Sequence, residues 1–551
     1  MLGLMQQQPL QISSLLAFAA RHHGSAEIVS NTVEGIRHRY TYRHAERRAR
    51  RLARVLEGLG VRPGDRVGTL AWNGYRHYEL YFAVSGMGAV VHTINPRLFD
   101  EQIVFIIDHA EDRILFVDLT FVPLLERVLG RLRRRPEAVV VLTDHEHLPK
   151  LALPSGMALH AYEDLLAATT EDFCWPTLDE NQAAVLCYTS GTTGMPKGVL
   201  YSHRSTVLHA YAINLADVIG LRSADRVLPV VAMFHVNAWG IPYAATMVGA
   251  GLVFAGARSD GASLHELITS ERVTYAAAVP TVWSGLVQHL ERSGGRLDGL
   301  QRICVGGAAC PKALHATLAE TYGVRVQQGW GMTEMSPIGA YNSPKQVLDE
   351  AADATTCPRR LKQGRAFFGV DLRINDADGR ELPWDGATSG ELVVRGPWIC
   401  RGYFRADRDA VDAGGWFSTG DIATIDADGY LQITDRSKDL IKSGGEWISS
   451  IELENIAAGH PDVAEAAVIA ARHPRWDERP LLLVVPKAGR RIDIAAVLAL
   501  FPGNVARHAV PEAGLVVDSL PHTATGKLLK TALRECYGDY YLDRPAASAT
   551  T

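Results

Sequence analysis

The chain has 551 residues, of which 47% are hydrophobic and 21% are charged, and its formal net charge is −5. This length exceeds a single ordinary core and predicts two or more domains. The negative charge, with no basic run interleaved with aromatic residues, argues against a nucleic-acid-binding protein. The seven cysteines form no CxxC pair and no zinc-ligand spacing with histidine, so we expect reduced thiols and a cytoplasmic protein.

The N-terminal segment, MLGLMQQQPLQISSLLAFAARHH, predicts an amphipathic helix. It lacks the basic start of a signal peptide, and its apolar stretch is short. No segment of the chain reaches the length of a membrane span. We therefore expect no membrane-spanning segment.

Short apolar runs then alternate with helical patterns through most of the chain. Helical spacing at Arg47–Gly58 is followed by a strand at Val67–Ala71, a helix at Tyr75–Gly88 and a strand at Ala89–Ile94. This β-α-β order predicts parallel sheets covered by helices. Further strands are expected at Arg226–Val231, Gly251–Ala255, Tyr275–Pro280 and Arg302–Val305.

A loop rich in glycine and hydroxyl groups, YTSGTTGMPKG at 188–198, follows an apolar strand at Ala183–Cys187. Glycines let the backbone approach an anion closely, and hydroxyls and an ammonium add donors without negative charge. Pro196 stands where a Walker A loop has the glycine before its lysine, so this is a different phosphate loop. A flexible connector is the alternative. The residues expected to hold phosphates are Thr189, Ser190, Gly191, Thr192, Thr193, Gly194 and Lys197.

The segment GWGMTEMSP at 329–337 follows an expected strand at Val324–Val326 and is predicted to form a tight turn. It offers an aromatic ring, a hydroxyl group and the carboxylate of Glu334. One acid beside a phosphate loop suits Mg²⁺, which prefers one or two carboxylates together with phosphate oxygens. A glycine-rich turn with a solvated glutamate is the alternative.

From residue 364 the pattern changes. Expected strands at Val370–Ile374, Gly390–Arg395 and Tyr430–Thr434 are separated by Asp/Gly turns, which predicts a small antiparallel or barrel-like region. Within it, Asp421 of the sequence STGD could accept hydrogen bonds from ribose hydroxyls. Asp and Gly are also ordinary turn residues, so an ordinary turn is the alternative.

The run DRSKDLIKSGGEW at 435–447 alternates basic and acidic residues before two glycines. Such a run is usually a solvated surface. Because this run lies where the character of the predicted domains changes, it indicates a hinge that also touches nucleotide. Near the C-terminus, PHTATGK places Lys527 on a glycine turn. Between these two segments we expect helices at Ser450–His460 and Ile494–Phe501 and strands at Val463–Ala470 and Leu481–Pro486.

The predicted fold is therefore α/β. A large N-terminal domain of βα-rich sheets is expected at 1–435, with a small barrel-like subdomain at 364–435. A small, mobile α+β domain is expected at 436–541. Residues 542–551 are expected to form a disordered tail.

Taken together and in this order, the phosphate loop and the later segments resemble the acyl-CoA synthetase branch of the adenylate-forming, or AMP-binding, superfamily over nearly the whole chain. The segment MFHVNAWGIPY at 233–243 looks like the fatty-acyl-CoA ligases. The N-terminal segment and the stretches GTLAWNGYRHYELYF and QGWGMTEMSP look closest to the methylmercaptopropionate-CoA ligases, which also accept short and medium fatty acids. The resemblance implies ATP, Mg²⁺ and coenzyme A as co-substrates and cofactors, and a homodimer.

The resemblance also implies a role for each matched residue. Thr189 and Glu334 lie near magnesium, Lys527 is the lysine of the adenylation step, and Lys438 is the hinge. Many family members have tyrosine where Trp330 stands, and either aromatic ring can stack on adenine. The further nucleotide residues are Gly307, Gln328, Gly329, Trp330, Thr333, Asp421, Arg436 and Lys438. The acyl pocket is implied at His235, Trp239 and Gly331, and the thioester-forming face at Lys442, Gly444, Gly445, Glu446, Trp447 and Glu478.

The activity implied is an ATP-dependent, AMP-forming acid–CoA ligase for a short- or medium-chain carboxylic acid, with 3-methylmercaptopropionate as a candidate. A medium- to long-chain fatty acid is the alternative, because Trp239 does not fix chain length. His235 and Trp239 could also be ordinary core residues. Luciferase-type oxidation, a peptide-synthetase adenylation domain and a degenerate acyl- or nucleotide-binding protein are the rival functions. The last should have lost Lys527, Glu334 or the phosphate loop, and all three are intact.

Overall fold

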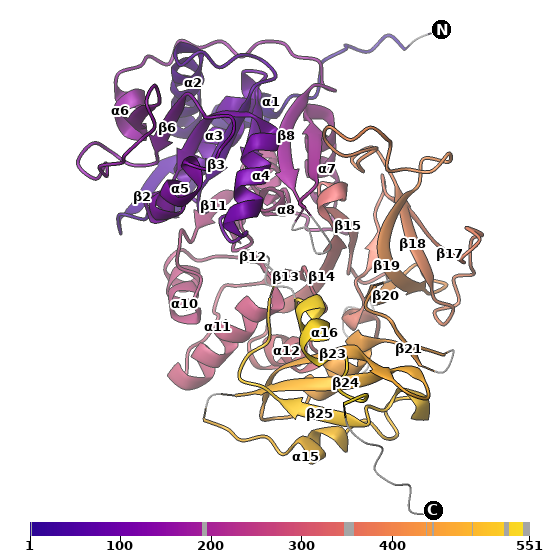
Figure 1. The fold of residues 1–551 in the computed structure, drawn as a ribbon. Coiled ribbons are helices and arrows are strands. Elements are labelled where there is room, and N and C mark those ends of the chain that lie inside the picture. Colours follow the sequence, from indigo (N-terminus) through magenta and orange to yellow (C-terminus); the bar gives the residue numbers. More distant parts are fainter. Residues whose placement is uncertain are drawn as a thin grey trace, which may run out of the picture.

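The computed structural model describes residues 1, 3–189, 195–345, 358–436, 438–443, 446–487, 489–522 and 528–543. Within these residues the strands form four sheets. Figure 1 shows two large sheets with their helices in the upper body, a small orange sheet beside them and a yellow sheet below. The expected α/β fold class is confirmed.

The first large sheet has seven strands and is parallel except at one edge. Its last two strands, β8 and β9, form an antiparallel hairpin in which Tyr188 pairs with Gly198. The sequence analysis did not predict this hairpin, because the long phosphate loop separates its two strands. In sheet order the strands are β7 (Ala158–Ala161), β6 (Ala138–Val141), β5 (Asp112–Val117), β3 (Arg66–Leu70), β4 (Val90–Thr93), β8 (Ala183–Tyr188) and β9 (Gly198–Ser202).

The second large sheet has nine strands and is parallel across its centre. Antiparallel strands close both edges. In sheet order the strands are β16 (Arg365–Ala366), β15 (Ile338–Tyr341), β14 (Arg325–Gly331), β13 (Arg302–Gly306), β12 (Tyr275–Ala278), β10 (Arg226–Pro229), β11 (Gly251–Phe254), β1 (Glu27–Asn31) and β2 (Arg37–Thr41).

Helices pack between and outside the two large sheets. Helix α3 (Tyr75–Gly86) is buried along its whole length except at Arg76, because it lies in a core that both sheets share. The same core contains α1 (Ile12–His22), α2 (Tyr42–Gly58), α7 (His203–Ile213) and α9 (Ile241–Val248). The outer faces are covered by α4 (Asp100–Ala110) and α5 (Val122–Leu129) on one sheet and by α10 (Gly261–Ser270) and α11 (Pro280–Ser293) on the other. Shorter helices are α6 (Tyr162–Ala167) and α12 (Lys312–Ala316).

The third sheet is antiparallel and has the order β17 (Asp371–Asn375), β18 (Gly390–Arg395), β19 (Phe417–Ile425) and β20 (Leu431–Arg436). The Asp/Gly turns between its strands form as expected. The Asp426 carboxylate accepts hydrogen bonds from the backbone N–H groups of Asp428 and Tyr430, and Gly429 takes a φ of 85° that only glycine adopts easily.

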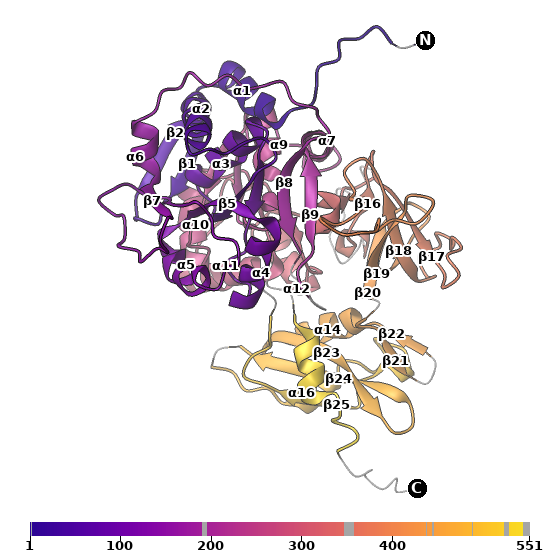
Figure 2. The ribbon, with the colours of Figure 1, turned by 45° about the horizontal axis from the view of Figure 1, so that its top comes forward.

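The C-terminal sheet consists of β22 (Glu446–Ile448), β21 (Ile441–Ser443), β24 (Asp477–Pro486) and β23 (Val463–His473), with β25 (Ala513–Val516) beside β24. Helices α14 (Ser450–Ala458), α15 (Ile494–Leu498) and α16 (Lys530–Tyr537) pack on it. In Figure 2 the C-terminal sheet and its helices lie below the rest of the molecule, and β20 lies at the connection.

Three strands extend further than the sequence pattern predicts. Strand β14 continues through Trp330 to Gly331, so the tight turn expected from residue 329 begins three residues later. Strands β23 and β24 form a hairpin that reaches His473 and Asp477, because cross-strand pairing carries both strands past the apolar runs. The expected strand at Tyr275–Pro280 ends at Ala278, since Pro280 begins α11, a position that proline favours.

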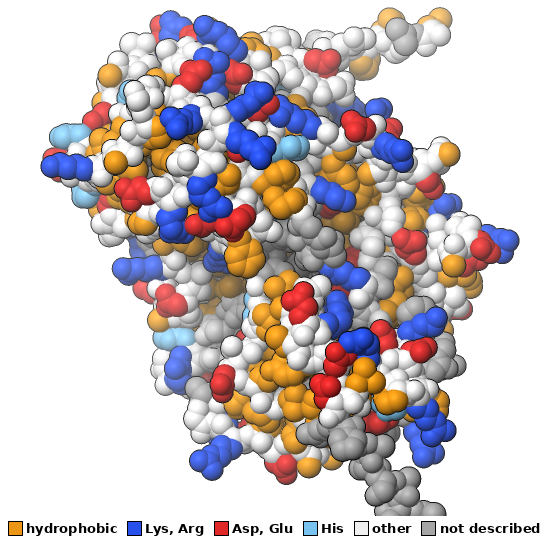
Figure 3. All heavy atoms as spheres, in the orientation of Figure 1, with side chains coloured by type: hydrophobic (Ala, Val, Ile, Leu, Met, Phe, Trp, Pro, Cys, Tyr) orange, Lys and Arg blue, Asp and Glu red, His pale blue; other side chains and the backbone are white. Residues whose placement is uncertain are grey.

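Charges of both signs are mixed over the face of the molecule shown in Figure 3. A mixed surface gives no large field of one sign. Attraction of an anionic substrate therefore depends on basic groups at the site itself.

Candidate active site

A cavity of about 540 Å³ lies where the C-terminal edges of the two large sheets meet. Ligands of parallel α/β sheets usually bind at this edge, because the loops that leave the strands gather there. The seven-stranded sheet contributes Trp72 and Asn73 after β3, Arg97 after β4 and Thr189 after β8. The nine-stranded sheet contributes residues after four of its strands: 230–232 and 234–236, Ala255, Val279 and Gly307.

The cavity brings together most of the residues that the sequence analysis assigned to ATP and to the acid. The nucleotide residues that line it are Thr189, Lys197, Gly307, Gly329, Trp330, Thr333, Glu334 and Arg436. The three residues expected at the acyl pocket, His235, Trp239 and Gly331, line the same cavity. Residues from six separate segments thus face one space.

The two ends of the phosphate loop are joined directly. The N–H of Thr189 donates to the carbonyl of Lys197 at 2.9 Å, and the N–H of Lys197 donates to the Thr189 hydroxyl at 3.1 Å. These bonds close the connection between β8 and β9 into a hairpin. Five expected phosphate-binding residues, Ser190, Gly191, Thr192, Thr193 and Gly194, lie outside the described residues, as do Lys527, Gly444 and Gly445.

Glu334 is buried in a short turn, Thr333–Met335, that follows β14. Its Oε1 accepts a hydrogen bond from the Tyr403 hydroxyl at 2.8 Å, and its carbonyl accepts from the N–H of Cys400 at 2.8 Å. The Thr189 hydroxyl lines the same cavity. No cluster of three or more metal-type side chains occurs among the described residues. One carboxylate and one hydroxyl fit Mg²⁺, which takes its other ligands from phosphate and water.

Trp330 connects the large sheet to the small antiparallel sheet. Its indole N–H donates to Asp421 Oδ2 at 2.9 Å. Asp421 pairs across β19 and β20 with Arg436, and their side chains form an ion pair at 3.6 Å. The aromatic residue expected at adenine and the acid expected at ribose are therefore adjacent.

Gln328 does not line the cavity. Its amide nitrogen donates to the carbonyl of Leu361 at 2.7 Å, and its amide oxygen accepts from the N–H of Cys310 at 3.1 Å. Both ends of the buried side chain are thus used by backbone groups behind β14. The amide of Gln328 holds the strand that carries Gly329 and Trp330.

The wall of the cavity near Trp239 contains a short turn, α8 (Val236–Trp239), with an unusual backbone. All four residues have positive φ values, between 43° and 59°, in the left-handed region that L-amino acids rarely occupy. The indole of Trp239 packs on Gly306, where an added Cβ would lie 2.8 Å from the ring. Glycine at 306 therefore leaves the space that the indole fills.

A group of residues beside this cavity was not identified from the sequence. Asn73 is buried, and its amide nitrogen donates to the carbonyls of Pro229 and Val231, both at 2.8 Å. Its amide oxygen accepts from the N–H of Met233 at 2.7 Å. Asn73 therefore ties the end of β3 to the segment that leads into His235. The only sequence signal for Asn73 was the tripeptide WNG after an expected strand, and this pattern does not indicate which residues the asparagine bonds to.

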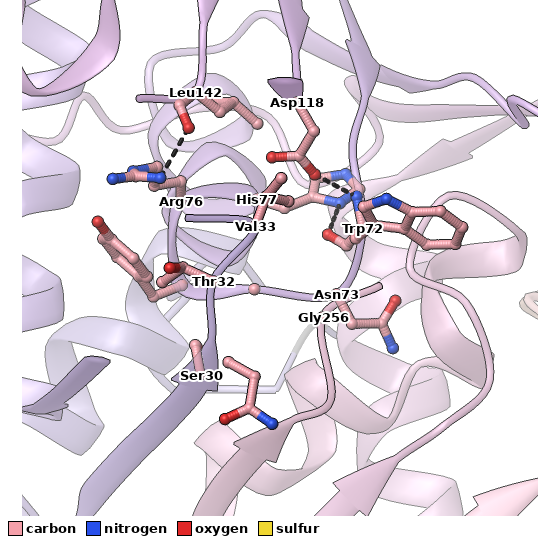
Figure 4. Close-up of a pocket in the computed structure, with 13 residues that line it drawn as sticks. Ser30, Thr32, Val33, Trp72, Asn73, Arg76, His77, Asp118, Leu142 and Gly256 are labelled. Atoms are coloured by element: carbon pink, nitrogen blue, oxygen red, sulfur yellow. Dashed lines mark hydrogen bonds between the residues drawn. The ribbon is translucent and has the colours of Figure 1, made fainter. Parts of the chain in front are cut away.

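Asp118, which follows β5, supports the same turn, as Figure 4 shows. Its Oδ2 accepts a hydrogen bond from the N–H of Trp72 at 2.6 Å, and the His77 ring contacts the Trp72 carbonyl at 3.1 Å. Burial is the main reason why the pKa of Asp118 is raised to about 7. Both backbone polar groups of Trp72 are thus held in place.

The residues expected at the hinge and the thioester-forming face lie away from the cavity. The N–H of Lys442 donates to Glu478 Oε2 at 2.8 Å, which joins β21 to β24. Asp435, just before the expected hinge Lys438, accepts from the N–H and the hydroxyl of Ser450 at 2.6 and 2.7 Å. Glu446 and Trp447 form β22 with Ile448.

Comparison with known proteins identifies two matching family models. The model of AMP-binding enzymes matches residues 16–404, and the model of their C-terminal domain matches residues 452–527. The chain is 50% identical to a 3-methylmercaptopropionyl-CoA ligase of Ruegeria lacuscaerulensis, over 98% of this chain and 99% of the relative. It is 48% identical to a medium-chain-fatty-acid–CoA ligase of Ectopseudomonas oleovorans, over 98% of each.

Solved structures show the same fold. ATP-bound MatB from Rhodopseudomonas palustris has a TM-score of 0.79 and 26% identity, with 96% of this chain and 99% of that chain covered. An anthranilate CoA ligase in complex with anthranoyl-AMP has a TM-score of 0.85 at 24% identity, with 98% and 100% covered.

Proposed function

Because the chain belongs to the AMP-binding enzyme family, we propose that it is an ATP-dependent, AMP-forming acid–CoA ligase. The observation that supports this most is the shared cavity. Lys197, Thr189 and Glu334 face the same space as the apolar end near Trp239, so one cavity offers groups suited to a triphosphate and to an acyl chain. ATP, Mg²⁺ and coenzyme A are the small molecules that this chemistry uses.

A carboxylate is a poor electrophile, and its attack on the α-phosphate of ATP brings two anions together, which repel at every distance. Lys197, Arg436 and the backbone N–H groups of the phosphate loop would reduce this repulsion. Glu334 and Thr189 would hold a magnesium ion, which supplies further positive charge at the phosphates. Trp330 and Asp421 would bind adenine and ribose. The product of this step would be an acyl-adenylate, with pyrophosphate released.

We propose that the acid has an uncharged, largely apolar tail. The cavity wall beyond His235 consists mainly of aliphatic and aromatic side chains, among them Val230, Val231, Trp239, Val279, Val282 and Ile338. Such a wall suits a short or medium acyl chain or a thioether such as that of 3-methylmercaptopropionate. A medium- to long-chain fatty acid is the second candidate. A long-chain-fatty-acid–CoA ligase of Thermus thermophilus is 46% identical to this chain, over 98% of this chain and 97% of the relative.

In the second step the thiol of coenzyme A must reach the same carbonyl. We propose that the part after residue 435 rotates about Lys438 and replaces Lys527 with the face at Lys442, Gly444 and Gly445. A hinge of this kind needs only a few residues. The proposal divides the chain into domains at 1–435 and 436–541 and assigns Glu446, Trp447 and Glu478 to the coenzyme A side.

Two assays test the proposed function. Exchange of labelled pyrophosphate into ATP should depend on the acid and on Mg²⁺, and acyl-CoA should form only when coenzyme A is added. A panel of 3-methylmercaptopropionate, propionate through dodecanoate, and an aromatic acid, ranked by kcat/KM, would identify the acid class. Failure of every acid to support exchange, with ATP bound, would refute ligase activity.

We further propose a cytoplasmic homodimer. Among the helices of the described residues, none has both the length and the hydropathy needed to cross a bilayer. The N-terminal arm extends away from the body in Figures 1 and 2, and its Leu4 and Met5 are 93% and 82% exposed. An apolar arm of this kind suits contact with a second copy. Light scattering on the full chain and on a chain lacking residues 1–10 would test the dimer.

A further inference from the structure

Tyr403 stands between two groups of opposite charge in the cavity. Its hydroxyl donates to Glu334 Oε1 at 2.8 Å, and the Lys197 ammonium lies 4.8 Å from the centre of its ring. All three side chains line the same cavity. One tyrosine therefore contacts both the acid that suits Mg²⁺ and the lysine that suits phosphate.

The backbone on either side of Tyr403 fixes its place. The N–H of Phe404 donates to the carbonyl of Gly198 at 2.8 Å, which attaches this segment to the phosphate hairpin. The N–H of Cys400 donates to the carbonyl of Glu334 at 2.8 Å, which attaches it to the turn after β14. The segment at 400–404 thus bridges the two large sheets at the cavity.

The contacts of Tyr403 orient both charges without neutralising either. A carboxylate beside Lys197 would form an ion pair and reduce the attraction of the ammonium for phosphate. An aromatic face attracts an ammonium through its quadrupole and leaves its charge intact. Among the described residues, the Lys197 ammonium lies over the ring of Tyr403, 4.8 Å from its centre, while the hydroxyl of the same side chain contacts Glu334.

The phenol is suited to remain a donor. The hydroxyl lies 2.8 Å from Glu334 Oε1 and supplies the proton of this hydrogen bond, because an ionised carboxylate can only accept. A hydrogen bond from a hydroxyl to a carboxylate is among the stronger kinds in proteins.

We infer that Tyr403 is a positioning residue of the adenylation step, which holds Glu334 through its hydroxyl and Lys197 through its ring so that both face the triphosphate of ATP. This inference rests on the proposed function for the identity of the ligand. The hydroxyl serves the acid that would hold Mg²⁺, and the ring serves the lysine. The two parts of one side chain can therefore be removed separately.

Two variants separate these roles. Tyr403→Phe keeps the ring and removes the hydroxyl, so it should raise the Mg²⁺ concentration for half-maximal ATP binding about 10-fold. Its affinity for ATP in EDTA should stay unchanged. Tyr403→Leu also removes the aromatic face, so it should lower the affinity for ATP in EDTA about 10-fold as well. Calorimetric titration of the purified full chain with ATP, with and without Mg²⁺, measures both effects without requiring turnover.

Tyr430→Phe is the matched control. Tyr430 is buried, and its hydroxyl donates to the carbonyl of Ser343 at 3.0 Å, outside the residues that line the cavity. This variant should bind ATP and Mg²⁺ as the wild type does. Thermal unfolding of all three variants would show whether each is folded.

A normal Mg²⁺ requirement in Tyr403→Phe would overturn the role of the hydroxyl, and equal ATP affinities for the Phe and Leu variants would overturn the role of the ring. Failure of the proposed function has a different signature. In that case wild-type protein would bind ATP but exchange no pyrophosphate with any acid. The calorimetric comparison of the variants would then still decide the role of Tyr403 in nucleotide binding.

Discussion

The indole N–H of Trp330 donates a hydrogen bond to Asp421 at 2.9 Å, across the junction between the nine-stranded sheet and the small antiparallel sheet. The ring thus has two functions in the proposed enzyme: its face is available to adenine, and its edge orients the acid beside the ribose. A tyrosine at this position would have no N–H at the same place. The contact makes the binding of the base and the binding of the sugar depend on each other.

Trp330→Phe should keep the aromatic face and lose the hydrogen bond to Asp421. Because a hydrogen bond to a charged group is involved, we expect KM for ATP to rise about 10-fold, with kcat changed little. Initial rates of pyrophosphate exchange at varied ATP would measure this. Trp384→Phe, at an exposed position in the connection between β17 and β18, is the control. Equal KM values for wild type and Trp330→Phe would contradict the role of the N–H.

Lys438→Pro should separate the two half-reactions. Proline fixes φ near −65° and restricts the residue before it, so rotation about this position would be blocked. We expect pyrophosphate exchange to persist. Thioester formation should fall about 100-fold or more, because the proposed second step requires the part after residue 435 to rotate about Lys438. Lys438→Ala, which keeps backbone freedom, should retain both activities better. Equal loss of both half-reactions in the proline variant would argue against a hinge at this residue.

Asn73→Ala should weaken both the fold and the acid site. It removes three buried hydrogen bonds that hold the segment at 229–233, so the free energy of unfolding should fall by about 2–4 kcal/mol. The same segment leads into His235, so KM for the acid should rise more than KM for ATP. Urea unfolding and steady-state kinetics would test the two parts.

Asn181→Ala is the control for this variant, because Asn181 is exposed and bonds only locally to Asp179. It should leave unfolding and both KM values unchanged. A normal KM for the acid in Asn73→Ala would show that the three hydrogen bonds of Asn73 stabilise the fold but do not shape the acid site.

Asp118→Asn should stabilise the protein at neutral and alkaline pH. The folded-state pKa of Asp118 is raised to about 7 from 3.8, so the folded protein retains a proton that the unfolded chain releases. The wild type therefore loses stability as the pH rises between these two values, by up to about 4 kcal/mol. Arg76 opposes the shift, and Glu34 adds to it, while His77 contacts the same turn.

Melting temperatures of wild type and Asp118→Asn between pH 4 and pH 8 would test whether the variant becomes the more stable protein as the pH rises. The difference should be small near pH 4, grow as the pH rises and level off above pH 7. Asparagine can still accept the bond from the N–H of Trp72, so the turn should be retained. A difference that shrinks as the pH rises would contradict a raised pKa.

Much of the fold follows from local patterns in the sequence. The β-α-β order predicted parallel sheets, and residues of several segments that were expected to bind phosphate and the acyl chain do line one cavity. The reason is that parallel strands place their following loops at one edge. Hydrophobic periodicity is sufficient to predict such helices and strands, because the pattern depends only on residues that are close in sequence.

The missed features are contacts between distant parts of the chain. Asn73 bonds to Val231, and Trp330 bonds to Asp421, across 158 and 91 positions respectively. No local pattern contains such a pairing. Gln328 shows the opposite error: Gly329 and Trp330 line the cavity, but the amide of Gln328 bonds to the backbone of Leu361 and Cys310 instead.

The left-handed turn at Val236–Trp239 bears on how readily the acid preference can be changed. Each L-residue in this conformation costs about 1–2 kcal/mol relative to a right-handed one, so this part of the cavity wall carries backbone strain. Replacing Val236 or Trp239 by glycine would relieve it at one position but leave a cavity that costs more, because both side chains are buried. Ala238 loses only one methyl group in the same exchange, so it is the position from which laboratory evolution toward other acids can loosen the turn at the smallest cost in thermal tolerance.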